Sequence, residues 1–183
     1  MHIDRDPDLE LSRRLRLDRV PPSGVSLDIE ASASEREALA RRFGIIAVSE
    51  LEASVALHAE PAGTWRVDGR LHATVVQACG VTLEPVEQRI DEPFDLRFAA
   101  GAEEVDRVTG ELVVDADAPE PLAGDSLDLG EIVADQLGLA IDPFPRKPGA
   151  SLADILPASA GATDRSSPFA ALEQLKRGKK NKN

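Results

Sequence analysis

Two long runs of alternating apolar and polar residues, joined by a short turn, constrain this chain more than any other feature. The first is "SELEASVALHAE", residues 49–60, and the second is "TWRVDGRLHATVVQAC", residues 64–79, with Pro61-Ala62-Gly63 between them. Alternation with a period of two predicts antiparallel strands that bury one face and expose the other. The residues expected on the buried face are Leu51, Ala53, Val55, Leu57, Trp65, Val67, Leu71, Ala73 and Val75, with Arg66, Asp68, Arg70 and His72 on the exposed face.

Further strands are predicted on both sides of this pair. Residues 25–29 place Val25, Leu27 and Ile29 on one face, and residues 9–19 have a less regular strand-like pattern. Downstream, two separate strand patterns cover 81–90 and 94–98, and "TGELVVDAD", residues 109–117, is a candidate short strand. Gly69 falls on the buried parity of its strand, which suggests a bulge or a bend there.

Helices are marked mainly by the residues at their ends. A helix is predicted over 34–43, where Ser34 and Glu37 fit a capping box and Gly44 stands at the position of a left-handed C-cap. A second helix is predicted over 127–139, with Ser126 or Asp128 as its N-cap and apolar residues at helical spacing. A short third helix is expected after Ser167-Pro168.

These elements predict an α+β fold. No strand–helix–strand unit recurs, so a parallel doubly wound sheet is not expected. We expect a mainly antiparallel curved sheet or a partly closed β-barrel, packed by two helices, with the C-terminal helix tethered. The expected organisation is one domain over 1–156, a flexible linker over 157–167, "PASAGATDRSS", and a short helix with a basic tail over 168–183.

Charge is distributed unevenly along the chain. The formal net charge is −12, yet the last eight residues carry five positive charges and no negative one, so the rest of the chain carries −17. Nucleic acid should be repelled by such a body and attracted by the tail. The tail is either a solubilising terminus or a contact for RNA or a particle, made by Lys176, Arg177, Lys179, Lys180 and Lys182.

The cellular compartment is constrained by two further observations. The chain has one cysteine, Cys79, and therefore no internal disulfide, which suits a reducing environment. No apolar run is long enough for a signal peptide or a membrane span. We expect a soluble cytoplasmic protein that makes no contact with a membrane.

Candidate catalytic residues are few. Cys79 would need a base such as His58 or His72 to act as a nucleophile, but His72 faces the opposite side of its strand, which favours a small buried hydrophobe. One cysteine and three scattered histidines do not make a zinc site. The carboxylates between 84 and 95 are more typical of a solvated sheet face than of an acid–base pair. These carboxylates are Glu84, Glu87, Asp91, Glu92 and Asp95. We therefore expect that the protein is not an enzyme and that it binds no cofactor.

The loop "PFPRKPG", residues 143–149, is the segment most typical of a binding site. Three prolines and a glycine restrict the loop, which carries Phe144, Arg146 and Lys147. An aromatic ring beside two cations suits base stacking together with phosphate contact. The loop could equally serve to fix the end of the preceding helix, and the sequence leaves both interpretations open.

Several blocks of the chain resemble the bacterial YceD family of large ribosomal RNA subunit accumulation proteins. The central block is "VVQACGVTLEPVEQRIDEPFDLRF", residues 75–98, and three others agree in order: "ASASEREALARRFGIIAVSELEA", "LDLGEIVADQLGLAIDPFPRKPGA" and "SPFAALEQLK". The resemblance covers roughly residues 9–177. It implies a role in the synthesis, processing or stability of 23S ribosomal RNA, and it carries over no catalytic residue. In the family that it resembles, the gene commonly lies beside the gene of a ribosomal protein of the large subunit.

The resemblance also gives a context for Cys79. Many members of the family have a Cys-x-x-Cys pair at this point, whereas here Thr82 stands at the second position and the block around 142–149 has no cysteine. The segment therefore resembles a family signature from which a metal or structural pair is missing. Its marked residues are Gln77, Cys79, Thr82, Glu84 and Pro85.

Two functional hypotheses follow. In the first, the chain is a factor for large-subunit assembly or rRNA maturation that contacts ribosomal RNA or a precursor particle through its tail, Arg146 and Lys147. In the second, the acidic body is a binding module or holdase for a basic ribosomal protein, because charge complementarity would speed and strengthen that encounter. The sequence leaves the oligomeric state open.

Overall fold

The structure, a computed structural model, describes residues 3–100, 118–122 and 124–151. Met1–Lys147 form one compact unit, and Pro148–Asn183 form a second. The first unit holds all the helices and strands of the described residues, and only these are discussed below. Their bounds are β1 Arg14–Arg16, a 3-10 turn Leu17–Arg19, β2 Val25–Glu30, α1 Ala33–Phe43, β3 Ala47–Ala59, a 3-10 turn Pro61–Gly63, β4 Thr64–Ala78, β5 Pro85–Ala99, β6 Glu120–Pro121, β7 Ser126–Asp128 and α2 Leu129–Ala140.

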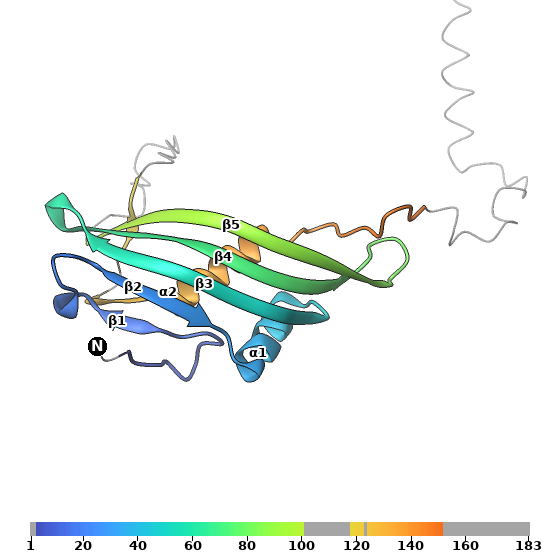
Figure 1. Cartoon of the computed structure of the whole chain (residues 1–183), viewed down its shortest axis with the longest axis horizontal. Helices are drawn as coiled ribbons and strands as arrows, with labels where there is room; N and C mark the ends of the chain where they lie inside the picture. The colour runs from blue at the N-terminus through green and yellow to red at the C-terminus, as the bar shows by residue number, and fades with distance from the viewer. Residues whose placement is uncertain (1–2, 101–117, 123, 152–183) are drawn as a thin grey trace, which may run out of the picture. The chain divides into compact units, whose positions relative to one another are not determined.

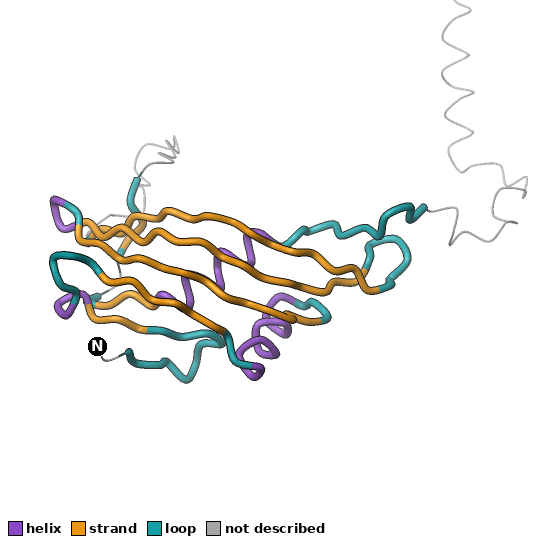
Figure 2. The backbone as a smooth tube through the Cα atoms, viewed as in Figure 1, coloured by secondary structure: helices purple, strands orange, loops and turns teal. Residues whose placement is uncertain are grey.

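The main sheet has five strands in the order β2-β3-β4-β5-β6, and β1 and β7 make a separate antiparallel pair (Figures 1 and 2). The pairs from β2 to β5 are antiparallel, and only the short β5–β6 pair is parallel. The predicted α+β class and the antiparallel character are therefore confirmed. The alternative of a partly closed barrel is wrong, because the strand order leaves β2 and β6 at opposite edges of an open sheet.

The core lies between one face of the sheet and the helices. Figure 1 shows α2 running behind the sheet, while the face turned to the viewer carries no helix. Every residue predicted on the buried faces of β3 and β4 is buried except Trp65, which is partly buried. Burial of such aliphatic side chains supplies most of the stability of a sheet of this kind. Other core residues are Leu39 of α1, Ile90, Phe94 and Phe98 of β5, and Val133 and Leu137 of α2.

Three predicted element boundaries need correction. The capping box of α1 is made by Ser32 and Glu35 rather than by Ser34 and Glu37, although Gly44 ends the helix in the left-handed region as predicted. The two strand patterns over 81–90 and 94–98 are one strand, β5, since Pro93 lies within a continuous ladder. Of residues 9–19, only β1 is strand. The second helix begins after its N-cap Asp128, one of the two predicted caps.

Gly69 does not form the predicted bulge. It pairs in register with Val55 on β3 and Phe94 on β5, and the register shift in β3 lies instead between Val48 and Glu50. A Cβ atom at Gly69 would lie 2.6 Å from Cζ of Phe94 and 2.3 Å from the carbonyl oxygen of Ser54. Glycine is therefore needed here because an aromatic ring covers the strand backbone.

Candidate functional site

A tight turn joins β4 to β5 and begins at Cys79. The N–H of Cys79 donates to the carbonyl of Glu84 at 2.8 Å, and the N–H of Leu83 donates to the carbonyl of Cys79 at 2.9 Å. Leu83 has a φ of 61°, in the left-handed region that side chains other than glycine seldom adopt. The two hydrogen bonds hold the turn in this conformation and direct the Leu83 side chain into solvent, where it is 77% exposed.

The Cys79 thiol is buried, as predicted, but it is not simply a small hydrophobe. Its Sγ accepts hydrogen bonds from the backbone N–H groups of Lys147, Thr82 and Val81, each with an N···S distance of 3.4 Å. These donors, led by the N–H of Lys147, lower the pKa of the thiol from 9.0 to about 6 and outweigh the opposing effect of burial. The backbone dipoles therefore favour the charged form of the sulfur.

A strap of residues 140–147 is fastened to β4, β5 and their connecting turn by further hydrogen bonds. Gln77 donates to the carbonyl of Asp142 at 2.8 Å, and Gly80 donates to that of Pro145 at 2.9 Å. The Gln88 amide bonds Asp142 and Ala140, each at 3.0 Å. The strap is therefore held at several points along its length, which confirms that the proline-rich loop fixes the end of the preceding helix.

The three predicted binding residues of the strap differ in their surroundings. Phe144 is 77% exposed, and its N–H donates to the Asp142 carboxylate at 2.8 Å, which orients the turn around it. Arg146 is exposed and has no ion-pair partner among the described residues. Lys147 binds Glu84 at 2.8 Å, so its charge is already neutralised within the protein. The strap thus presents one aromatic ring and one available cation.

Three of the five predicted carboxylates, Glu87, Asp91 and Asp95, lie on the exposed face of the sheet. The other two differ: Glu84 lies in the turn before β5, and Glu92 pairs with Leu71 on the parity of the buried face, although its own side chain is exposed. Asp95 binds Arg66 at 2.7 Å, and Asp91 binds Arg70 at 2.6 Å. Hydrogen bonds from these arginines keep the pKa of each carboxyl below its usual value. An acid–base pair needs two carboxyls with pKa values moved apart, and here both are lowered. These residues form cross-strand ion pairs rather than a catalytic dyad.

The β2–β3 half of the same face carries acids with no cation among them. Glu30 of β2 stands directly opposite Glu52 of β3, and Asp28 and Glu50 are on the same face. Like charges directly opposite each other on a sheet are destabilising. A recess of about 640 Å³ lies beside this region, over β3, β4 and β5, and is lined by Glu50 and Glu52 together with His72 and Arg89. Sequence reasoning missed this cluster, because only the strand register brings Glu30 to Glu52.

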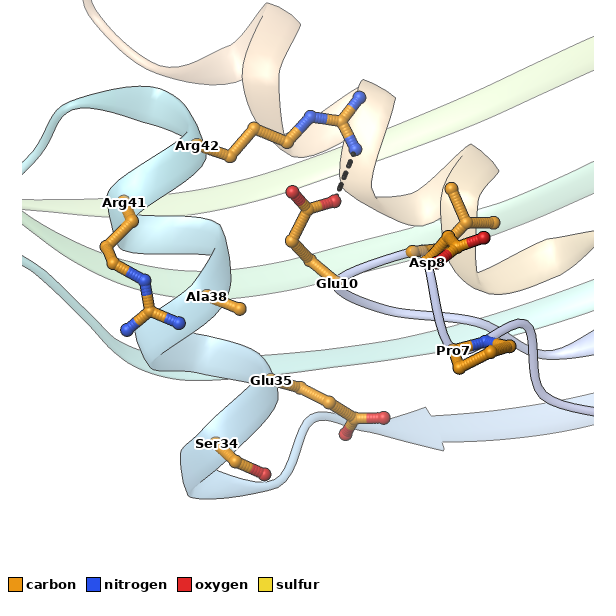
Figure 3. A pocket seen from close by; sticks show the side chains of 9 residues that line it. Pro7, Asp8, Glu10, Ser34, Glu35, Ala38, Arg41 and Arg42 are labelled. Atoms are coloured by element: carbon orange, nitrogen blue, oxygen red, sulfur yellow. Dashed lines mark hydrogen bonds and ion pairs between the residues drawn. The ribbon is translucent and has the colours of Figure 1, made fainter.

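A second recess, of about 540 Å³, lies between the N-terminal segment and α1 (Figure 3). Most of the charged side chains that line it are paired. Arg42 binds Glu10 at 3.3 Å, and Glu35 binds Arg13, which Figure 3 does not draw, at 2.7 Å. Glu35 is also the residue that closes the capping box of α1. The arrangement is that of a packed junction between two segments, and we assign it a structural role.

The donor atoms around Cys79 do not fit a metal ion. Thr82 stands three residues after Cys79 and offers no thiol, and its hydroxyl donates to Glu84 at 3.3 Å. Zinc in proteins takes four ligands from cysteine, histidine and carboxylates, whereas this turn offers a single sulfur already engaged by three N–H groups. Among residues 3–100, 118–122 and 124–151, no group of three or more such side chains is placed to hold a metal.

Several predicted features lie outside the described residues. They are the candidate strand over 109–117, the linker over 157–167, and the third helix with its tail, including Lys176, Arg177, Lys179, Lys180 and Lys182. In the described part of the chain, no helix is long and apolar enough to cross a membrane.

The turn at Cys79, the strap and the β5 carboxylates lie within a segment that matches a known family. The family described as large ribosomal RNA subunit accumulation protein YceD matches residues 67–176, well over half of the chain. The chain belongs to the YceD family. The matched segment includes most of β4 together with β5, α2 and the strap, and therefore also the turn at Cys79. No curated protein and no solved structure matches the chain.

Membership of the YceD family has a direct functional meaning. It ties the chain to the accumulation of the large ribosomal subunit RNA. The YceD family is not a known family of enzymes. The family membership that we predicted from the blocks around residues 75–98 and 127–150 is therefore confirmed.

Proposed function

We propose that this chain is a non-enzymatic factor that supports 23S rRNA accumulation by binding a precursor of the large ribosomal subunit in the cytoplasm. The observation that carries the proposal is the YceD match over residues 67–176. The strap supports it, because a multiply fastened backbone presents Phe144 and Arg146 with little ordering cost on binding. The basic tail over 176–183 supplies further cations for phosphate contact.

The first experiment compares cells with and without the gene and measures the ratio of 23S to 16S rRNA. Loss of the gene should lower that ratio. A tagged protein should sediment with large-subunit precursors at low salt, and the association should weaken as salt rises, because phosphate contacts release counterions. Protein found only at the top of the gradient at every salt concentration would exclude binding to the particle.

Deleting 176–183 separates the contribution of the tail from that of the strap. We expect the truncated protein to retain some association and to lose most of its salt dependence, since five cations are removed together. The Arg146→Ala variant removes the one available cation of the strap and should reduce the salt dependence by a smaller step. An unchanged salt dependence in both variants would argue against phosphate contact by either segment.

A second candidate function is the binding of a basic ribosomal protein before its incorporation. The observation that favours it is the acidic half-face formed by Asp28, Glu30, Glu50 and Glu52, where Glu30 and Glu52 oppose each other at a cost to the fold. A basic partner would relieve that repulsion. Binding of a purified basic ribosomal protein to the wild type, measured at two salt concentrations, tests it. No binding at low salt would exclude this role.

A further inference from the structure

The large hydrophobic side chains that are exposed gather at one end of the first unit. Among the described residues they are Ile46, 53% exposed, Leu83 and Phe144, each 77% exposed, and Leu139, 80% exposed. Figures 1 and 2 show that the α1–β3 connection and the β4–β5 turn lie at this end of the sheet, and that the strap runs from the end of α2 towards it. We call these four residues the apolar end.

Hydrogen bonds and packing link the segments that carry the apolar end. The N–H of Ile46 donates to the carbonyl of Val76 at 2.9 Å, just before the β4–β5 turn. The Phe43 ring packs on the backbone of Gly138, next to Leu139. Gly80 of the turn donates to Pro145 of the strap. The segments that carry the four side chains are therefore joined to one another rather than being independent loops.

Two of these side chains are exposed by backbone that is firmly held. Leu83 has a positive φ, and the turn keeps it there although its side chain gains no burial. Phe144 sits between the points at which the strap is fastened to Gln88 and to Gly80. Strained or rigid positions that expose large apolar groups are typical of binding surfaces, and rigid aromatic anchors contribute strongly to interfaces.

The charges around these anchors favour a protein over RNA. In the turn and the strap, residues 79–84 and 140–147, the charged side chains are Glu84, Asp142, Arg146 and Lys147, so the positive and negative charges balance. Lys147 is bound to Glu84, which leaves one cation unpaired. An RNA surface needs several available cations for its phosphates. At the same end of the sheet Glu87 is paired with Arg89 at 3.4 Å, whereas Glu50 and Glu52 have no ion-pair partner among the described residues and suit a partner whose surface is basic around an apolar recess.

We propose that the apolar end docks a protein component of the large-subunit precursor, with Phe144 and Leu83 as its anchors. This inference rests on the proposed function and adds the class of partner. The basic tail and Arg146 remain the contacts for RNA, and the apolar end makes the contact that does not depend on phosphate. Binding through it should therefore depend much less on salt than binding through the tail.

The test uses the full-length chain and two probes: precursor large subunits purified from cells lacking the gene, and protein-free 23S rRNA. The variants are Leu83→Gly, Phe144→Ser and their combination. Glycine accepts the φ of 61° at position 83, so its side chain is removed without loss of the turn. The matched control is Ala62→Gly, which relieves a φ of 63° in the turn at the other end of the β3–β4 hairpin.

We expect the double variant to bind precursor particles about tenfold or more weakly than the wild type, with equal loss at low and moderate salt. Binding to protein-free rRNA and the urea midpoint should be unchanged, and Ala62→Gly should behave as the wild type. If the wild type and the double variant bind the particle equally well, this inference is overturned, whereas the proposed function is not. An equal loss on protein-free rRNA overturns it in favour of base stacking. If the wild type does not bind the particle, the proposed function fails as well.

Discussion

The sulfur of Cys79 accepts a hydrogen bond from the backbone N–H of Lys147, 68 residues further along the chain, at 3.4 Å. This contact joins the start of the β4–β5 turn to the end of the strap. The same lysine binds Glu84 through its side chain at 2.8 Å, so the junction is closed by two contacts of different chemistry. The single cysteine of the chain therefore acts as an acceptor that positions the strap, and several measurable properties follow from it.

Replacing Cys79 with Ser should remove a pH-dependent part of the stability. The folded thiol has a pKa of about 6 and the unfolded one a pKa near 9, so the unfolded state binds more protons between these values. The contribution of the thiolate is therefore complete above about pH 9 and is lost as pH falls through 6. In urea unfolding at pH 6, 7.5 and 9, the free energy of unfolding of the wild type should rise relative to that of Cys79→Ser as pH rises. A constant difference between the two would contradict a thiolate.

Substitution of Glu35 by Gln should destabilise the fold by about 2 kcal/mol at neutral pH, since the carboxylate accepts from Arg13 and also closes the capping box. Burial alone would raise the pKa of Glu35, but the hydrogen bonds from Arg13 and Ser32 outweigh it and lower the pKa to about 2. This stabilisation is present above pH 4.5 and is lost as pH falls towards 2. Denaturant unfolding at pH 7 and pH 3 should show the difference shrinking. Glu37→Gln, which removes an exposed carboxylate of the same helix outside the box, serves as the control.

Gly69→Ala should cost about 2 kcal/mol or more, because the added methyl group would overlap Phe94 and the backbone of Ser54. Combining it with Phe94→Leu should recover part of the loss by removing the ring, although the contact with the Ser54 carbonyl remains. Thermal unfolding of the single and double variants measures the coupling. Strict additivity would show that the ring does not set the requirement for glycine at this position.

The Glu52→Gln variant should stabilise the fold by roughly 0.2–1 kcal/mol, because it removes the repulsion from Glu30 across the β2–β3 pair. If the acidic half-face binds a basic ribosomal protein, the same change should weaken that binding at low salt. Glu37→Gln on α1 is the matched control, since it removes an exposed charge away from this face. A gain in stability with unchanged binding would assign the acidic half-face no role in that interaction.

Much of the fold could be predicted from local patterns. The alternation around Val55 and Leu71 identified the buried faces of β3 and β4, and Gly44 identified the end of α1. The boundaries that were wrong depend on contacts distant in sequence. Ser32 rather than Ser34 caps α1 where Arg13 binds Glu35, and Pro93 does not interrupt β5 because it continues the ladder opposite Arg70.

The candidate site was predicted only in part. The proline-rich loop was identified from composition, and the burial of Cys79 from its parity. The acceptor role of its sulfur was not predictable, because it depends on the N–H of Lys147 reaching back across the sheet. Lys147 also pairs with Glu84, which removes one of the expected phosphate contacts. The sequence pattern did not predict this pair, because its two residues are far apart along the chain. Leu83 was not singled out, since its exposure depends on a turn that the sequence pattern had assigned to a strand.

The pairing of β1 with β7 has a consequence for the order in which the protein can form during synthesis. Arg14 and Ser126, which bond each other across this pair, are 112 residues apart. At about 5–20 residues per second, a ribosome needs roughly 6–22 s to travel that distance. Throughout that interval Leu11 and Leu15, both buried in the finished fold, lack their final partners. The nascent chain therefore has an apolar N-terminal segment that cannot reach its final packing until β7 has been synthesised.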